Sequence, residues 1–347
     1  MTKASPEQIR ALRNERPEMR ERDFARIHQI SEADLVAAFT GESVTRLRPD
    51  VAALLEAAPS LGEVMALTRN ESAVHEKIGP FEKTGYGKHA AIALGEQIDL
   101  RIFPGKWAFG FAVEKRDAEN NVKRSLQFFD AHGDAVFKIH ARPATDLAAW
   151  EALVGSLTSE DQSATLETTP RPPRAAPENP ADRAALRARW EKLTDTHQFH
   201  GMLRDLKLDR LDALGMVGED FAWPLAAEAV PLLFNESARL ALPVMVFVGN
   251  GGCIQIHSGP IAEIKPMGPW LNVMDPDFHL HLRLDHIVSL WAVRKPTADG
   301  HVTSVEAYGA DGDLIIQFFG KRHEGVDERT EWRALVEALP LSTLTAA

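Results

Sequence analysis

The sequence predicts an α+β protein made of two copies of one domain, each with helices followed by an antiparallel β-sheet. Three observations support this prediction. The 347-residue chain exceeds the usual span of a single hydrophobic core. A long sequence pattern occurs twice, and a polar, proline-rich segment separates the two copies. We therefore expect a tandem structural repeat whose halves are related by a pseudo-twofold axis.

The repeat keeps a constant spacing. Residues 70–81, NESAVHEKIGPF, match residues 250–261, NGGCIQIHSGPI, and residues 98–115 match 278–295, both at an offset of 180 (250 − 70; 278 − 98). The Gly-Asp pairs 133–134 and 312–313 differ by 179, so one residue is lost in a turn. The upstream IHQI (27–30) also resembles THQF (196–199). We expect an N-terminal repeat over 1–156, a linker over 157–182 and a C-terminal repeat over 183–347.

Each repeat begins with helical signals. Ser31 is a typical helix N-cap with Asp34 in the first turn, and Gly41 follows the end of that helix. Residues 48–67 also contain a helical pattern. A helix starting at the Asn179 cap and Pro180 is expected to run to residue 206, and another is expected over 327–339.

Beyond about residue 66 the pattern changes to short apolar runs separated by turn residues, as antiparallel strands require. We expect strands at 98–103, 106–113, 124–130 and 135–141. Residues 289–320 predict a three-stranded meander with turns at 298–300 and 311–313.

Composition excludes several classes of protein. The formal charge of −11 argues against general nucleic-acid or anionic-membrane binding. The longest apolar run, ALPVMVFVG (241–249), is far shorter than the ~20 residues of a membrane helix, and the charged N-terminus does not resemble a secretory signal. The single cysteine, Cys253, is expected to be a buried strand thiol and excludes Cys-rich metal sites. A cytoplasmic protein is the expectation.

Motifs of hydrolases and nucleotide enzymes do not occur. The chain has no G-x-S-x-G, P-loop or G-x-G-x-x-G pattern, and GNGG (249–252) is expected in a turn between strands.

The stretch TDTHQFH (194–200) has two histidines three residues apart. On the expected helix, Trp190, Leu193, His197 and Arg204 lie close together, and His200 is displaced by about 60°. His197 is therefore either a partly buried, hydrogen-bonded histidine or a metal or haem ligand. A second run, HLHLRLDH (279–286), is either a solvated strand face or part of a zinc site, although zinc needs three or four ligands.

The combined pattern resembles a known family. A duplicated chain with DLRIF in its first half, TDTHQFHGMLRDLKLDRLDAL opening its second, and WAVRKPT with QFFGKR near its end is similar to the cytosolic HemS/ChuS/PhuS (HmuS-type) haem-utilisation and haem-degrading proteins. The resemblance covers nearly the whole chain except the linker. It implies haem b (iron protoporphyrin IX) bound in a cleft between the repeats.

The resemblance also implies site residues. His197 matches the axial histidine, and His200 takes the place of a second histidine that some members carry. Arg101 matches the distal arginine of DLRIF, and the remaining implied binding residues are Arg210, Lys295, Gln317 and Arg322. Phe318 and Phe319 carry no hydroxyl where the family often has one.

Alternative roles remain for several residues. Instead of a role at the haem, Arg101 could form a bridge between the domains, and Lys295 and Arg322 could be surface charges at strand ends. His28, which matches His197 in the first repeat, is either a vestige of duplication or part of a second haem site.

Three functions are consistent with this resemblance. In the first, the chain is an enzyme that opens the haem ring with electrons from a reductase, and Arg101 orients a distal water or oxygen. Alternatively, it is a chaperone that passes haem from an inner-membrane importer to a separate haem oxygenase, with exchange between His197 and His200 as the transfer step. A storage role that limits free haem is the third. The His-x-x-His pair favours transfer.

Overall fold

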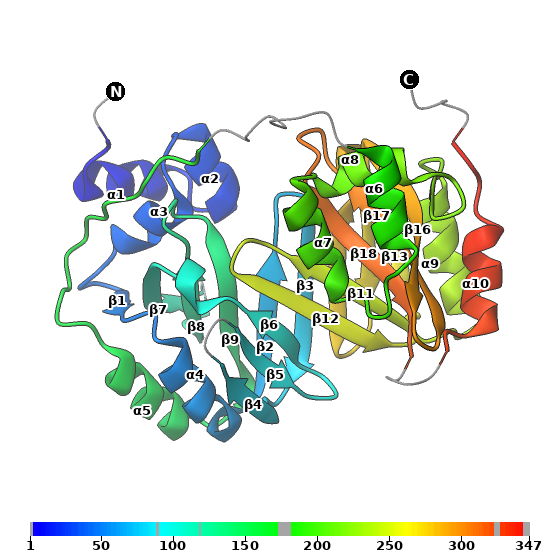
Figure 1. Ribbon diagram of the computed structural model, residues 1–347. Coiled ribbons are helices and arrows are strands. Elements are labelled where there is room, and N and C mark those ends of the chain that lie inside the picture. Colours follow the sequence, from blue (N-terminus) through cyan, green and yellow to red (C-terminus); the bar gives the residue numbers. More distant parts are fainter. Residues whose placement is uncertain (1–2, 88–89, 118, 173–181, 323–326, 343–347) are drawn as a thin grey trace. The chain divides into compact units, whose positions relative to one another are not determined.

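A computed structural model describes residues 3–87, 90–117, 119–172, 182–322 and 327–342 of the chain. The chain divides into two compact units, one made mainly of the first repeat and the other mainly of the second. The strands form two nine-stranded sheets, and the recorded strand pairs within each unit are antiparallel. Figure 1 shows the elements of both units. The predicted α+β class and the repeat are confirmed.

Unit 1 contains a five-stranded run in the order β1-β7-β8-β9-β2. Its strands are β1 (Val44–Leu47), β7 (Phe109–Arg116), β8 (Val122–Phe129), β9 (Ala135–Thr145) and β2 (Gly62–Arg69). A three-stranded run, β4 (Lys83–Tyr86), β5 (Ala91–Leu94) and β6 (Asp99–Ile102), and the strand β3 (Ala73–Gly79) complete its strands.

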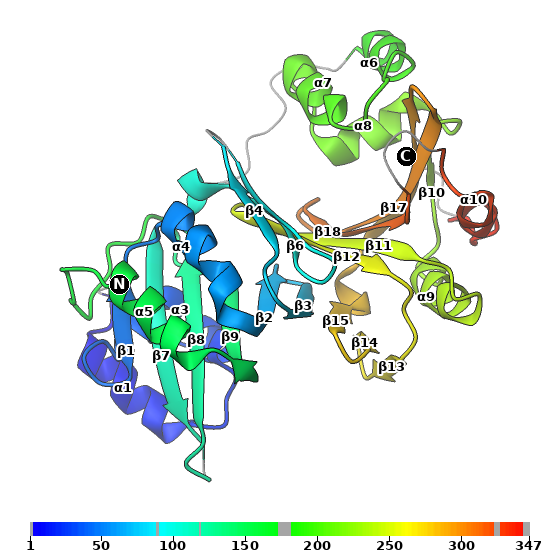
Figure 2. The ribbon, with the colours of Figure 1, turned by 90° about the horizontal axis from the view of Figure 1, so that it is seen from below.

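Helices cover both faces of the five-stranded run of unit 1 (Figure 2). Helix α3 (Glu32–Ala37) packs on the face that carries Phe111, Val113 and Phe129. Helices α4 (Val51–Ala57) and α5 (Leu147–Leu157) pack on the opposite face. The N-terminal helices are α1 (Pro6–Glu15) and α2 (Glu21–Ile27), and short 3₁₀ turns span Ala58–Leu61 and Pro104–Lys106.

Unit 2 repeats this plan. Its five-stranded run has the order β10-β16-β17-β18-β11, and its three-stranded run is β13-β14-β15. The strands are β10 (Ala222–Pro224), β16 (Ser289–Thr297), β17 (Gly300–Tyr308), β18 (Leu314–Gly320), β11 (Val244–Gly249), β12 (Cys253–Gly259), β13 (Ile264–Met267), β14 (Trp270–Met274) and β15 (Phe278–Arg283). A 3₁₀ turn spans Leu284–His286.

The helices of unit 2 form two groups. One face of its five-stranded run is covered by α6 (Arg183–Trp190), α7 (Gln198–Leu206) and α8 (Arg210–Val217), which share a core with Val293 and Tyr308. The other face carries α9 (Ala229–Arg239) and α10 (Thr330–Glu337). Two buried indoles fix these layers, because Trp190 donates to the Arg294 carbonyl at 2.9 Å and Trp332 to the Thr303 carbonyl at 2.9 Å.

Most strand and cap predictions are confirmed. Ser31 caps α3 in a capping box with Asp34, and the meander over 289–320 forms β16, β17 and β18. Cys253 is a buried thiol at the start of β12. The helical pattern over 48–67 extends beyond the helix in the structure. The helical segment ends at Leu61, and β2 starts at Gly62, which has a φ of +68°. A left-handed backbone conformation of this kind is readily available to glycine.

Two matching turns belong to the opposite units. Residues 249–255 are part of unit 1, and residues 70–74 are part of unit 2. Asn250 Nδ2 donates to the Val136 carbonyl at 2.8 Å, and Asn70 Nδ2 donates to the Ile315 carbonyl at 2.7 Å. Because Val136 and Ile315 are 179 residues apart, the two asparagines make equivalent bonds in the two units.

None of the helices in the described part of the chain is both long enough and apolar enough to span a membrane.

Candidate functional site in unit 2

The segment that carries the two histidines is not one continuous helix. Helix α6 is capped by Asp182 and ends at Trp190, and α7 begins at Gln198. The predicted Asn179 cap lies outside the described residues. The prediction of a helix through residue 206 is wrong, because side chains between α6 and α7 bond the local backbone instead. The Asp195 carboxylate accepts the His197 N–H at 2.8 Å, and the Gln198 side chain accepts the Thr194 N–H at 3.1 Å.

This break separates Trp190 from His197. Trp190 is fully buried, whereas the His197 side chain is 93% exposed at the N-terminus of α7. The expected shared helix face of Trp190 and His197 therefore does not exist.

His197 is held in one orientation by Asp195. Its Nδ1 lies 2.7 Å from Asp195 Oδ1. In the neutral ring this contact places the proton on Nδ1 and leaves the lone pair of Nε2 free to bind a metal. The bonds from the His197 backbone and side chain lower the pKa of Asp195, and nearby Arg322 lowers it further. Asp195 therefore stays ionised at neutral pH.

His200 lies one turn further along α7. Burial, followed by the charges of Arg210 and Lys295, lowers the pKa of His200 below its ordinary value. A neutral imidazole is the form that binds iron or zinc. His200 is thus kept in the ligating form by its burial and by the cations near it.

Phe199 links the histidine helix to these cations. Its ring is buried, with the Lys295 ammonium 4.7 Å and the Arg210 guanidinium carbon 5.0 Å from the ring centroid. The Trp190 ring meets it edge-on at 4.8 Å between centroids. Cation–π contacts of this kind are worth roughly 0.5–2 kcal/mol each. They fix the start of α7 above the sheet.

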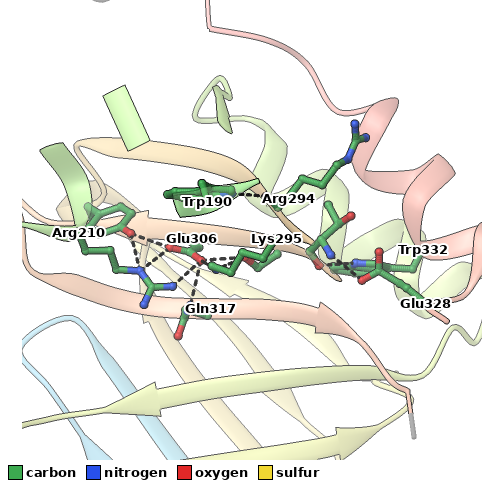
Figure 3. Close-up of polar contacts among 11 residues, drawn as sticks. Trp190, Arg210, Arg294, Lys295, Glu306, Gln317, Glu328 and Trp332 are labelled. Atoms are coloured by element: carbon green, nitrogen blue, oxygen red, sulfur yellow. Dashed lines mark hydrogen bonds and ion pairs between the residues drawn. The ribbon is translucent and has the colours of Figure 1, made fainter. Parts of the chain in front are cut away.

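The Arg210 and Lys295 side chains that contact Phe199 belong to a buried polar cluster centred on Glu306 (Figure 3). The fully buried carboxylate accepts two bonds from Arg210, at 2.7 and 2.8 Å, and one from Lys295 at 2.9 Å. It also accepts the Tyr308 hydroxyl at 2.7 Å and the Gln317 amide at 3.0 Å. A buried carboxylate is stable only when its charge and lone pairs are satisfied in this way.

The charges of the cluster shift one another's pKa. Burial opposes ionisation of Glu306, but Arg210 and Lys295 outweigh it and hold its pKa well below the ordinary value. Burial lowers the pKa of Lys295 to about 8, and Glu306 partly offsets that shift. Burial lowers the pKa of Arg210, but the charge and hydrogen bonds of Glu306 outweigh this effect and raise it. Arg210 therefore stays protonated.

The structure thus brings together five of the predicted residues: His197, His200, Arg210, Lys295 and Gln317 belong to α7 and the cluster under it. Sequence reasoning missed Glu306 and Tyr308, which complete the cluster. The available signal was the alternation in β17, where Ser304, Glu306 and Tyr308 share one buried face of the strand. Lys295 is 3% exposed, so the reading of it as a surface charge is wrong.

The other two predicted residues lie elsewhere. Arg322 follows β18 and is close enough to influence the pKa of Asp195. Arg101 is on β6 in unit 1, where it forms an ion pair with Asp99 and donates to the Leu100 carbonyl at 3.1 Å. Asp99 has a raised pKa because burial outweighs the effect of Arg101.

The other histidines that the sequence analysis singled out are His28 and those of β15. His28 is the C-cap residue of α2, whereas His197 is the N-cap residue of α7. In β15, His279, His281 and Arg283 alternate with buried residues, as predicted, and His281 Nδ1 lies 2.6 Å from Asn272 Oδ1. Among the residues that the structure describes, no cluster of three His, Cys, Asp or Glu side chains is arranged to hold a metal ion.

Known proteins match this architecture over nearly its whole length. Residues 29–157 and 207–339 each match the family model described as the haemin-degrading HemS/ChuX domain. Both histidines of α7 lie before the second match. The hemin transport protein HmuS of Yersinia pestis is 38% identical over 326 residues, which cover 94% of this chain and 94% of HmuS.

Solved structures agree. Holo-PhuS, a heme-binding protein from Pseudomonas aeruginosa, shares 44% identity and a TM-score of 0.94, covering 98% of this chain and 100% of that one. ChuS, described as an E. coli heme oxygenase, shares 35% identity and a TM-score of 0.87, covering 95% and 99%. With the HemS/ChuX domain matched in both repeats, the chain belongs to the HemS family of haem-utilisation proteins.

Proposed function

We propose that this chain binds haem b in the cytoplasm with His197 as the axial ligand and delivers it to a downstream protein. The observation that carries the proposal is the exposed His197 ring, whose Nδ1 is held by Asp195 so that Nε2 is free to bind iron. The relatives support haem as the ligand, because holo-PhuS is described as heme-binding and HmuS as a hemin transport protein.

Electrostatics of the cluster under α7 supports the same ligand. Arg210 and Lys295 carry two positive charges against the one negative charge of Glu306, so the region has a net charge of +1 (2 − 1). Haem carries two propionates, and a positive field in a chain of net charge −11 favours their approach. We propose that Gln317 helps to hold this cluster and that Arg322, whose charge acts on Asp195, pairs with a propionate.

Two histidines at the start of one helix favour transfer over permanent binding. His200 is one turn from His197, and its pKa is lowered, so it is available as an alternative ligand near neutral pH. We propose exchange between the two histidines as the step that releases haem to a haem oxygenase after delivery from an inner-membrane importer.

The alternative is an enzyme that degrades haem. It is favoured by the likeness to ChuS, which is described as a heme oxygenase. In that case Arg101, whose side chain on β6 is 38% exposed, orients a water or oxygen by hydrogen bonding.

Binding is tested by titrating the apoprotein with haemin and following the Soret band. His197→Ala is expected to change the spectrum and lower the affinity. His200→Ala is expected to keep the spectrum and slow transfer. His279→Ala, on β15 of the same unit, is the control and leaves both unchanged. The ligand assignment is contradicted if the spectrum and the affinity are unchanged both in His197→Ala and in the double variant His197→Ala/His200→Ala.

Carrier and enzyme are separated by turnover under air. The haem-loaded protein is mixed with ascorbate or a reductase in the presence of catalase. A stable Soret band, together with transfer to an apo haem oxygenase, supports the carrier. Loss of the band with release of iron or carbon monoxide, abolished in Arg101→Ala, supports the enzyme.

A further inference from the structure

Unit 1 contains a cavity that the haem proposal does not use. Its volume is about 670 Å³, which is within the range of sites for small organic ligands. Leu35 and Val36 of α3, with Val44 and Val113 of the sheet, form an apolar wall. Lys115, at the end of β7, provides a cation at the same cavity. The cavity therefore combines an apolar surface with a positive charge.

Lys115 is the repeat counterpart of Lys295, since the two are 180 residues apart in matched segments. In unit 2 the strand beside Lys295 supplies the buried Glu306. In unit 1 the corresponding strand position is Gln127, because Gln127 pairs with Lys138 as Glu306 pairs with Gln317. The carboxylate of one unit is thus replaced by a neutral amide in the other.

Three cations on the sheet of unit 1, Arg69, Lys115 and Lys138, are incompletely neutralised. Lys115 forms an ion pair with Glu21, and Arg69 forms one with Glu32. Lys138 is 9% exposed, and in the described part of the chain its ammonium has no ion-pair or hydrogen-bond partner. These three cations and two carboxylates leave a net charge of +1 (3 − 2).

The remaining charged residues that line the cavity have partners of their own. Glu42 pairs with Arg10, and Glu114 pairs with Arg124. Arg13 bonds three backbone carbonyls, and Arg116 bonds Asn120.

The pKa values reflect the same imbalance. Partial burial, and then the charge of Lys138, lowers the pKa of Lys115, whose side chain is 53% exposed, to about 8. Burial lowers the pKa of Lys138 to about 8, although Glu32 acts in the opposite direction. An added negative charge next to Lys115 would stabilise both ammonium groups.

We propose that the unit 1 cavity binds a small amphipathic carboxylate, with its charged group at Lys115 and its apolar body against Leu35, Val36, Val44 and Val113. The ligand carboxylate supplies the negative charge that Glu306 supplies in unit 2. The described residues that line the cavity include no histidine, so none of them corresponds to the axial histidine proposed in unit 2.

Decanoate is the probe, titrated by calorimetry into the full-length protein at pH 7. Wild type is expected to bind one equivalent saturably and to bind decanol more weakly. Lys115→Met is expected to weaken decanoate binding roughly tenfold or more, since it removes the cation that pairs with the ligand carboxylate. Lys115→Arg keeps the charge and retains binding. Lys123→Met removes an exposed lysine of the neighbouring strand β8 and is the matched control.

Three outcomes overturn the proposal. The first is that decanoate does not bind saturably, and the second is that wild type binds decanol as tightly as decanoate. The third is equal decanoate affinity in wild type and Lys115→Met when both proteins unfold at the same urea concentration. Competition with haem distinguishes this site from the one at His197. Preloading with haem, or the substitution His197→Ala, is expected to leave decanoate affinity unchanged, and displacement of decanoate by haem assigns the cavity to haem instead.

Discussion

The Lys295 ammonium lies 2.9 Å from the Glu306 carboxylate, and both side chains are almost completely buried on neighbouring strands. Arg210 binds the same carboxylate from α8. This triad supports Phe199, and through it the start of the helix that carries His197 and His200. The position of the candidate haem ligand His197 therefore depends on the charge of Glu306, a carboxylate that is fully buried.

Glu306→Gln is expected to destabilise unit 2 by about 3–5 kcal/mol, because two buried cations lose their shared counter-charge. Urea unfolding followed by tryptophan fluorescence measures the effect. The control is Glu337→Gln, which breaks an ion pair between Arg294 and a 56% exposed carboxylate and should cost less than about 1 kcal/mol. Equal losses in the two variants would show that the Glu306 cluster has no special role.

Asp195→Asn tests how His197 is oriented. The amide keeps the size of the side chain but removes the negative charge that bonds Nδ1. We expect haem affinity to fall by about 10–100-fold, the usual effect of losing an outer-shell partner of a ligating histidine. The rate of haem loss to an apoprotein acceptor measures it. Asp205→Asn, whose carboxylate is 60% exposed and pairs with Arg189, is the control.

His140 predicts a pH dependence of stability in unit 1. Burial, followed by Lys138 and Lys115, lowers the pKa of His140 to about 4. Between pH 6.5 and 4 the unfolded chain therefore binds a proton that the folded chain does not, so stability falls as the pH falls. The loss is about 2 kcal/mol between pH 7 and 5.

In His140→Gln this part of the pH dependence is expected to disappear. Urea unfolding of wild type and variant at pH 7 and pH 5 measures it, and the other titrating groups contribute equally to both proteins. The same difference between the two pH values in both proteins would refute the assignment.

Gly252→Ala tests the turn that belongs to unit 1. A Cβ at this position would lie 2.6 Å from a methyl group of Val136. We expect a loss of about 1–3 kcal/mol from this overpacking, measured by urea unfolding. Gly251→Ala is the adjacent control, since nothing lies within 4 Å of its Cβ. A smaller loss in Gly252→Ala than in Gly251→Ala would mean that the turn does not pack as described.

The sequence by itself determined the repeat, the strands and the identity of the candidate ligands. Strand alternation and turn residues are local signals, so β16, β17 and β18 are found where the pattern predicts them. His197 and His200 were identified from a short motif and its resemblance to a family. The helix through them was not predicted correctly, because α6 ends at Trp190 and Asp195 bonds the backbone of His197 just before α7 begins.

Only the tertiary structure decided which charges meet. Arg210, Lys295, Glu306 and Gln317 come from one helix and three strands, and their spacing along the chain does not reveal that they share one carboxylate. The same holds for the exchanged turns, where Asn70 and Asn250 bond backbone far away in sequence. The physical reason is that secondary structure follows from neighbours along the chain, whereas desolvation and Coulomb energy depend on distances that exist only after folding.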